Sequence, residues 1–277
     1  MIYADNAATT ALDIDAFEAM KPYLLKEYGN ASQPYSFARS AKKALAAARK
    51  TIADCIGAQP EEIFFTSGGT ESDNWAIKGT LQYGDGRAIL TSQIEHHAIL
   101  NACASVERLG YPVVYLSVDQ KGVLTPATLN KFITGNTKLV SVMLVNNEIG
   151  TIEPIKELAE IAHIHGAFFH TDAVQAVGHI PVNVKVLGID MLSASAHKFN
   201  GPKGIGFLYI RKGTDIHSLV DGGAQEFGMR AGTENIAAIV AMAEALRKNC
   251  AHMDETESRL CKMENSFIHV LNKAGID

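Results

Sequence analysis

Short apolar runs alternate along this chain with longer segments of helical periodicity. Runs with the length and the β-branched or aromatic content of buried strands lie at residues 62–66, 87–92, 112–118, 138–145, 167–171, 190–196 and 204–210. Helical segments lie between most of them, for example 42–56 and 155–166, and the second ends in a glycine as helices often do. This alternation predicts an α/β fold with a mostly parallel seven-stranded sheet covered by helices. The last two runs have no helix between them, so we expect one of them to pair antiparallel.

The chain beyond Thr233 has the pattern of one long or broken helix with an apolar face. The apolar positions are Ile236, Ile239, Val240, Ala243 and Leu246, and then Leu260, Met263, Phe267 and Val270. We expect this tail to pack on one side and to lead out of a large domain. The predicted organisation is an N-terminal segment at 1–15, a large domain at 16–235, and a connector helix with the start of a truncated small domain at 236–277. Such an arrangement would leave apolar surface exposed at the sheet edge and the connector.

Composition and charge narrow the function classes. The 277 residues carry a net charge of -5, with a pI near 6.1, which provides no basic field for nucleic acid or for an anionic membrane. The sequence has no membrane-spanning apolar run and no signal-peptide pattern at its start, so we expect a cytoplasmic protein. The four cysteines lack CxxC spacing, which argues against a disulfide framework and a zinc site. His163 and His165 do not share a helical face, and we predict no metal site.

Polar residues follow directly after several predicted strands, where ligands bind in open α/β sheets. The stretch SGGTESDN at 67–74 opens a helix with two glycines and a threonine. Free N–H groups there and the positive end of the helix dipole suit a phosphate, although a capped helix start is an equal alternative. The stretch lacks the GxxxxGK(S/T) sequence of a nucleotide-binding P-loop, which argues against a nucleoside triphosphatase.

Two further strand ends supply an acid and a lysine. Asp172 follows the run AFFHT, and Lys198 follows the run DMLSASA after a histidine. Each has a simpler explanation when taken alone, since a lone aspartate is more often a helix cap and a lone lysine more often lies on the surface. Together with a phosphate cradle they match pyridoxal phosphate, which requires a lysine for the Schiff base and a carboxylate for the ring nitrogen. His96 could lie flat against such a ring, or make local hydrogen bonds at a helix start.

Several longer motifs span nearly the whole chain in order: YADNAATT, FTSGGTESDNWAIKG, EHHAIL, VNNEIGT, HTDAVQAVG, SASAHKFNGPKGIG and GMRAGTEN. In these motifs the chain resembles the cysteine desulfurases, class V members of the fold-type I pyridoxal-phosphate enzymes. The resemblance implies that Lys198 forms the Schiff base, that Asp172 holds the pyridine nitrogen, and that His96 stacks on the ring and moves protons. It also implies further cofactor contacts: Gln175 at the ring hydroxyl, Gly69, Thr70, Ser195 and His197 at the phosphate, Asn147 beside the substrate and ring, and Thr233 at the phosphate of the neighbouring subunit.

The resemblance also implies an activity. Cysteine desulfurases are homodimers that convert L-cysteine to L-alanine and pass the sulfur, through a cysteine persulfide, to iron–sulfur scaffolds or other sulfur acceptor proteins. The persulfide cysteine lies in a C-terminal small domain that also supplies an arginine for the substrate carboxylate, and this sequence ends before either. The four cysteines present are better explained as structural residues of helices: Cys55, Cys103, Cys250 and Cys261. We therefore expect a chain that can hold the cofactor but is impaired in turnover.

Alternatives remain open at the level of sequence. A selenocysteine lyase or a class V aminotransferase would need no persulfide, although the motifs 65–79 and 228–235 resemble desulfurases more closely. A non-catalytic dimer that binds assembly partners would also be compatible with the missing cysteine. The stretches GNASQPYSFA and GGAQEF differ from the family pattern, and these differences concern the substrate channel more than the cofactor site.

Overall fold

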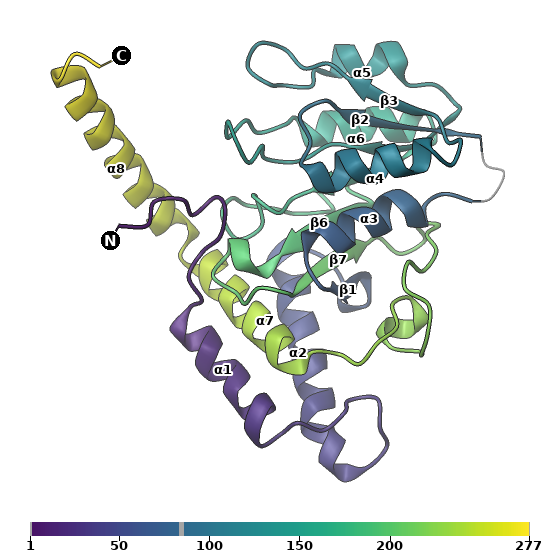
Figure 1. The fold of residues 1–277 in the computed structure, drawn as a ribbon, viewed down its shortest axis with the longest axis vertical. Helices are drawn as coiled ribbons and strands as arrows, with labels where there is room; N and C mark the ends of the chain where they lie inside the picture. The colour runs from purple at the N-terminus through teal and green to yellow at the C-terminus, as the bar shows by residue number, and fades with distance from the viewer. Residues whose placement is uncertain (1, 83–85, 277) are drawn as a thin grey trace.

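A single seven-stranded sheet forms the centre of the protein (Figure 1). The computed structural model describes residues 2–82 and 86–276, so Met1 and Asp277, the outer ends of the predicted terminal segments, lie outside the described residues. The strands are β1 (Ile63–Thr66), β2 (Ala88–Ser92), β3 (Val113–Leu116), β4 (Thr137–Ser141), β5 (Phe168–Asp172), β6 (Met191–Ser195) and β7 (Gly206–Ile210). Their order is β1-β7-β6-β5-β4-β2-β3, and only β7 runs antiparallel to its two neighbours. The predicted strands, the mostly parallel sheet and the antiparallel pairing are confirmed.

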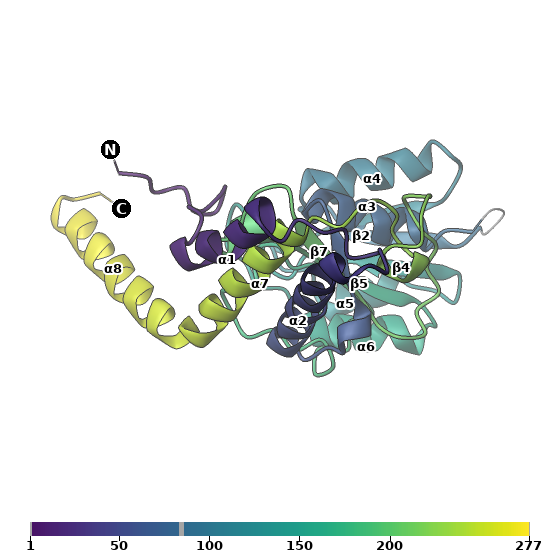
Figure 2. The ribbon, with the colours of Figure 1, turned by 90° about the horizontal axis from the view of Figure 1, so that it is seen from below.

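Helices cover both faces of this sheet (Figures 1 and 2). The helices of the described residues are α1 (Ile14–Leu25), α2 (Arg39–Ile56), α3 (Gly69–Gly79), α4 (His97–Glu107), α5 (Pro126–Phe132), α6 (Ile155–Ile164), α7 (Ile236–Ala251) and α8 (Met253–Lys273), and α8 does not lie against the sheet. One apolar cluster joins α3 and α4 to the sheet through Trp75 and Ile99, whereas a larger cluster on the other face includes Ile52 of α2 and Leu158 of α6. Each fully buried side chain of this kind stabilises the fold by roughly 1.5–3 kcal/mol. The two layers leave the strand ends free to form a site.

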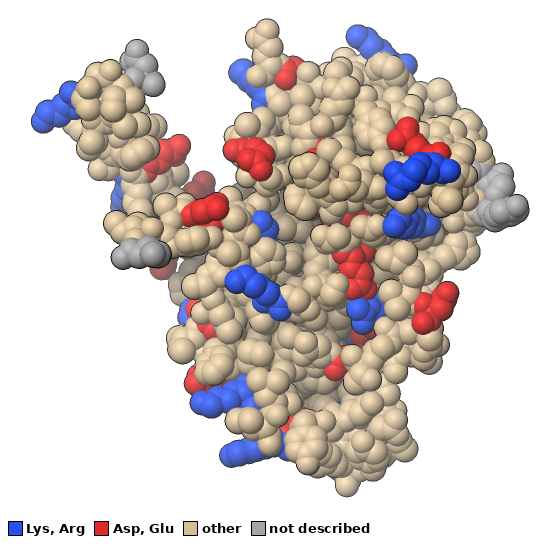
Figure 3. Space-filling model, in the orientation of Figure 1, with Lys and Arg blue, Asp and Glu red and all other residues tan. Residues whose placement is uncertain are grey.

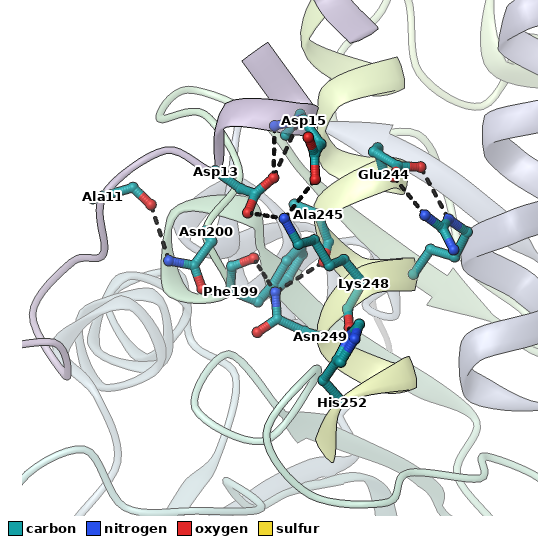
Figure 4. Close-up of polar contacts among 12 residues, drawn as sticks. Ala11, Asp13, Asp15, Phe199, Asn200, Glu244, Ala245, Lys248, Asn249 and His252 are labelled. Carbon is teal, nitrogen blue, oxygen red and sulfur yellow. Dashed lines mark hydrogen bonds and ion pairs between the residues drawn. The ribbon is translucent and has the colours of Figure 1, made fainter. Parts of the chain in front are cut away.

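The N-terminal segment is tied to α7 and to the loop that follows β6 (Figure 4). Lys248 of α7 places its Nζ 2.7 Å from Oδ2 of Asp13 and 2.6 Å from Oδ2 of Asp15. The side-chain amide of Asn200 donates to the carbonyl oxygen of Ala11 at 3.0 Å. These contacts bring the first residues of the chain next to the strand ends, where they become part of the candidate site.

The C-terminal tail is a broken helix. Its first part, α7, packs on the core and buries residues that include Ile236 and Leu246, as expected. Its second part, α8, has no buried residue, and Leu260, Met263 and Phe267 are 53%, 61% and 64% exposed. Figures 1 and 2 show α8 projecting away from the body of the protein. The expectation that the tail packs on one side is therefore wrong for α8, because no described element lies against its apolar face.

The surface carries both signs of charge. Figure 3 shows lysine and arginine side chains interspersed with aspartate and glutamate on the face it presents. Within residues 2–82 and 86–276, no helix combines the length and the apolar content that crossing a membrane requires.

Candidate active site

A cavity of about 810 Å³ opens at the carboxyl ends of β1, β4, β5 and β6. Its lining includes the predicted residues Gly69, Thr70, His96, Asn147, Asp172, Gln175, Ser195, His197 and Lys198. Thr233 is the exception, since it is exposed and lies outside this lining. The sheet order explains the grouping, because strands far apart in sequence end at the same edge of the sheet. Residues from six separated motifs thus meet in one place.

The amine of Lys198 lies inside this cavity, in a short 3₁₀ helix that follows β6. Its Nζ donates hydrogen bonds to the carbonyl oxygens of Ala7 and Ala8, the second at 3.0 Å. The side-chain amide of Gln175 donates to the same Ala7 oxygen at 2.9 Å. Burial lowers the pKa of Lys198, and the nearby carboxylate of Asp172 only partly opposes that effect. A lowered pKa makes the neutral, nucleophilic amine more available than it is on the surface.

The loop between β1 and α3 forms a cradle of backbone N–H groups. Helix α3 begins at Gly69, and the first N–H groups of a helix have no partner inside it. Gly68 has a φ of 147°, a conformation that side-chain-bearing residues rarely adopt. Gly206 of β7 faces this loop, and a Cβ at Gly206 would lie 2.7 Å from the Cα of Gly68. Glycine at both positions therefore allows the loop to approach the sheet, and Ser195 completes the concave surface.

An ion pair holds this loop in place. Arg230 donates from Nε to Oε1 of Glu71 at 2.8 Å and from Nη2 to Oε2 of the same residue at 3.0 Å. The N–H of Ser67 also donates to Glu71, at 2.7 Å. Burial raises the pKa of Glu71, but the bonds from Arg230 and Ser67 outweigh it and the net pKa is lowered. Sequence analysis did not identify this pair, because the two residues are far apart in the chain and join only in the folded protein.

A cluster of buried acids lies at the cavity, with Asp172 and Asp73 in its lining. Asp172 ends β5, and one of its oxygens accepts a hydrogen bond from the N–H of Val174 at 2.9 Å. Burial raises the pKa of Asp172, and burial also raises the pKa of Glu95 to about 8. Asp73 of α3 is buried beside them. Sequence analysis missed Asp73 and Glu95, although Asp73 had a detectable signal as an acid one turn before the apolar residue Ile77 on the helix face.

His96 occupies the start of α4, where its Nδ1 accepts a hydrogen bond from the N–H of Ala98 at 3.1 Å. It thus makes the local hydrogen bond expected of a histidine at a helix start and also lines the cavity. His97 is not among the lining residues, as expected of its neighbour on the helix. His197 also reaches the N-terminal segment, through a 3.0 Å contact between its Nδ1 and Oγ1 of Thr9.

No metal centre accompanies these groups in the described ranges 2–82 and 86–276, where no three histidine, cysteine, aspartate or glutamate residues gather as metal ligands. His163 instead contacts Asp190, with Nε2 and Oδ2 2.8 Å apart. The cysteines lie on helices and outside the cavity lining: Cys55 on α2, Cys103 on α4, Cys250 on α7 and Cys261 on α8. The site therefore offers an amine, acids and N–H donors, but no thiol.

Comparison with known proteins identifies the family. Residues 2–274 match the family model described as aminotransferase class-V. The cysteine desulfurase IscS of Dictyoglomus turgidum is 52% identical over 274 residues, which cover 98% of this chain and 70% of that protein. This chain belongs to the cysteine desulfurases of aminotransferase class V. The cysteine desulfurase IscS of Methanosarcina thermophila is 50% identical and is covered to 68% of its length. A solved NifS-like protein superposes on the chain with a TM-score of 0.96 and 38% identity, covering 99% of this chain and 76% of the other.

Members of this family use pyridoxal phosphate, and the residues present fit that group. An amine with a lowered pKa, a buried carboxylate and a cradle of N–H groups lie around one cavity: Lys198, Asp172 and the start of α3. The cradle is concave because Gly68 and Gly206 carry no Cβ, which leaves the backbone donors accessible to a phosphate. The fold is that of a fold-type I large domain, as the sequence predicted.

Proposed function

We propose that this chain acts on L-cysteine, releasing L-alanine and passing the sulfur to a thiolate as a persulfide. The observation that carries the proposal is the meeting of the Lys198 amine, the Asp172 carboxylate and the N–H cradle in one cavity. The names of the similar proteins support the same activity. A further solved structure, described as SspA in complex with cysteine, has a TM-score of 0.87 and 39% sequence identity to this chain. The match covers 89% of this chain and 72% of the other.

Each of the residues predicted for the site has a proposed task toward the cofactor. When bound, pyridoxal phosphate supplies an electron sink that stabilises negative charge on the substrate α-carbon. Lys198 would hold its aldehyde and Asp172 its ring nitrogen, while the ring would lie against His96. The remaining contacts are Gln175 at the ring hydroxyl, Asn147 beside the ring and substrate, and Gly69, Thr70, Ser195 and His197 at the phosphate.

Lys198 also has a role as acid and base. Its amine can take the proton from the substrate α-carbon once it is displaced from the cofactor, because burial lowers its pKa toward the working range of a general base. The carbonyl oxygens of Ala7 and Ala8 hold the amine within the cavity through hydrogen bonds. We propose that these carbonyls keep the lysine positioned between proton transfers.

Sulfur transfer needs a thiolate at the substrate sulfur. The Cβ–Sγ bond of cysteine breaks, the sulfur leaves on the attacking thiolate, and the electron pair left on the substrate takes protons to give alanine. The four cysteines of residues 1–277 lie outside the cavity lining. We therefore propose that residues 1–277 on their own bind the cofactor but turn over cysteine slowly. The same observation favours one second candidate, a selenocysteine lyase, whose reaction needs no persulfide.

The assembly follows from the same proposal. Thr233 would reach the phosphate of a neighbouring copy in a homodimer, and its exposure outside the cavity supports that placement. An iron–sulfur scaffold or another sulfur acceptor protein would take the sulfur, in the cytoplasm. The chain would divide into a segment at 1–15, a cofactor-binding domain at 16–235 and a connector at 236–277.

Lysine mapping tests the cofactor site. Purified protein is mixed with pyridoxal phosphate, its visible absorbance is recorded, and borohydride reduction is followed by peptide mapping. We expect a yellow protein labelled at Lys198, and no label in Lys198→Ala. Lys203 lines the same cavity and provides a matched control, since Lys203→Ala should leave the label unchanged. A label at Lys203, or none, would contradict the proposed site.

A product assay then tests the reaction. Alanine, sulfide and selenide are measured with L-cysteine and with L-selenocysteine as substrates. Alanine from cysteine at a low rate is expected for a desulfurase without its own thiolate. An added thiol should raise this rate and release sulfide, because it attacks the substrate sulfur and then reduces the persulfide so formed. Alanine from selenocysteine alone would favour the lyase, and rapid unaided turnover of cysteine would refute the proposed impairment.

A further inference from the structure

Asp73 is a buried acid to which the proposed function gives no task. It lies on α3, one turn after the start of the N-terminal cradle, and is 1% exposed. It lines the same cavity as Asp172, and the charge of Asp172 is one of the causes that raise the pKa of Asp73. Its Oδ1 has no hydrogen-bond partner among the residues that the structure describes. A buried carboxyl in this state is costly if it is ionised, so its protonation must be considered.

The pair cannot hold two negative charges, because the basic group beside Asp73 is neutral. The candidate cation is His170, whose Nε2 lies 3.8 Å from Oδ1 of Asp73. Burial lowers the pKa of His170 to about 3, so this imidazole is neutral and contacts the hydroxyls of Ser141 and Ser193. Glu95 adds a third carboxyl to the same buried region. Two like charges at a shared buried site force one group to keep its proton.

The surroundings decide which carboxyl keeps it. Asp172 accepts a hydrogen bond from the N–H of Val174 and shares the cavity with the amine of Lys198, and both favour its ionised form. Burial and the neighbouring Asp172 both act on Asp73 in the opposite direction and raise its pKa well above the usual value. The proton of the pair therefore belongs on Asp73.

We propose that Asp73 is a positioning residue that donates a hydrogen bond from its protonated carboxyl to Asp172, keeping Asp172 ionised and oriented toward the cofactor. This inference rests on the proposed cofactor site, because the ring nitrogen is what the Asp172 carboxylate would hold. A protonated Asp73 also reduces the negative charge that the three acids bring to one buried region. Its contribution acts through Asp172 rather than on the substrate.

Infrared spectroscopy tests the proton without the cofactor. A carboxylic acid band is expected in the cofactor-free protein at pH 7, and Asp73→Asn should remove it. Glu95→Gln serves as the matched control, since it should remove its own acid band and leave that of Asp73. Retention of every acid band in Asp73→Asn would overturn the proposal.

Cofactor binding tests the donor. Asp73→Asn keeps an N–H donor and should bind pyridoxal phosphate with nearly wild-type affinity, whereas Asp73→Leu has none and should bind about tenfold more weakly. Ring nitrogen chemical shifts from ¹⁵N-labelled cofactor should show a protonated ring in wild type and Asp73→Asn only. If Asp73→Asn and Asp73→Leu both bind the cofactor more tightly than wild type, the shared proton lies on Asp172. If wild type and both variants bind equally, Asp73 has no positioning role. Either result overturns the proposal. Failure of the wild-type chain to bind pyridoxal phosphate would instead refute the proposed function. The infrared band would then still show whether Asp73 is protonated.

Discussion

The buried ion pair between Arg49 and Glu226 is a point where a single charge change should cost much stability. Arg49 is 6% exposed and Glu226 is 5% exposed, and the two guanidinium nitrogens lie 2.8 and 2.6 Å from the carboxylate oxygens. The N–H of Phe65 also donates to Glu226, at 2.8 Å. Glu226→Gln keeps the shape but leaves a buried guanidinium without its counter-charge, which costs about 3–5 kcal/mol. The free energy of unfolding of a domain is about 5–15 kcal/mol in total, so this variant should be only marginally stable.

Urea unfolding, followed by circular dichroism at pH 7, measures this loss of unfolding free energy. We expect the m-value, the slope of the unfolding free energy against urea concentration, to stay unchanged. Asp54→Asn is the control, because the Lys50–Asp54 pair has side chains 67% and 61% exposed and should contribute less than about 1 kcal/mol. Adding Arg49→Met to Glu226→Gln should recover about 2 kcal/mol, since the unpaired charge is then gone. A loss below about 1 kcal/mol for Glu226→Gln alone would refute the reasoning.

Three further predictions concern the site. Gly206→Ala should weaken pyridoxal phosphate binding about tenfold in equilibrium dialysis, because its Cβ would press on the carbonyl oxygen of Ala194 and on Gly68 and displace the cradle, at a cost of about 1–3 kcal/mol. Unchanged affinity would contradict this. Arg230→Lys should weaken binding about threefold, since lysine cannot make both hydrogen bonds to Glu71, and it should do so without changing the unfolding midpoint by more than a few degrees. Glu95→Gln tests how stability depends on pH. Burial raises the pKa of Glu95 to about 8, so the folded protein keeps this proton where the unfolded chain loses it. The contribution of Glu95 to stability is therefore full below about pH 4.5 and is lost as the pH rises to about 8. Relative to wild type, the variant should gain about 1.4 kcal/mol per pH unit between pH 5 and 8 in urea unfolding, and a constant difference would count against this.

The amino-acid sequence by itself determined the class of fold. Short apolar runs and helical segments are local patterns, and burial on both sides of a parallel sheet leaves its strands almost continuously apolar. Local chemistry was equally readable at the strand ends, where Asp172, Lys198 and the glycines of 67–69 stand next to the runs that carry them. These features can be predicted without any knowledge of tertiary contacts, because each depends on residues within a few positions of one another.

Only the tertiary structure decided which distant residues meet. The order β1-β7-β6-β5-β4-β2-β3 is not the order of the chain, so neither the meeting of Asp73 and Asp172 in one cavity nor the ion pair of Arg230 with Glu71 could be derived from spacing. The tail showed the same limit, since α7 and α8 share an apolar pattern but only α7 has the core to pack against. Periodicity states which face of a helix is apolar, whereas burial and the resulting pKa shifts depend on what the rest of the chain places against that face.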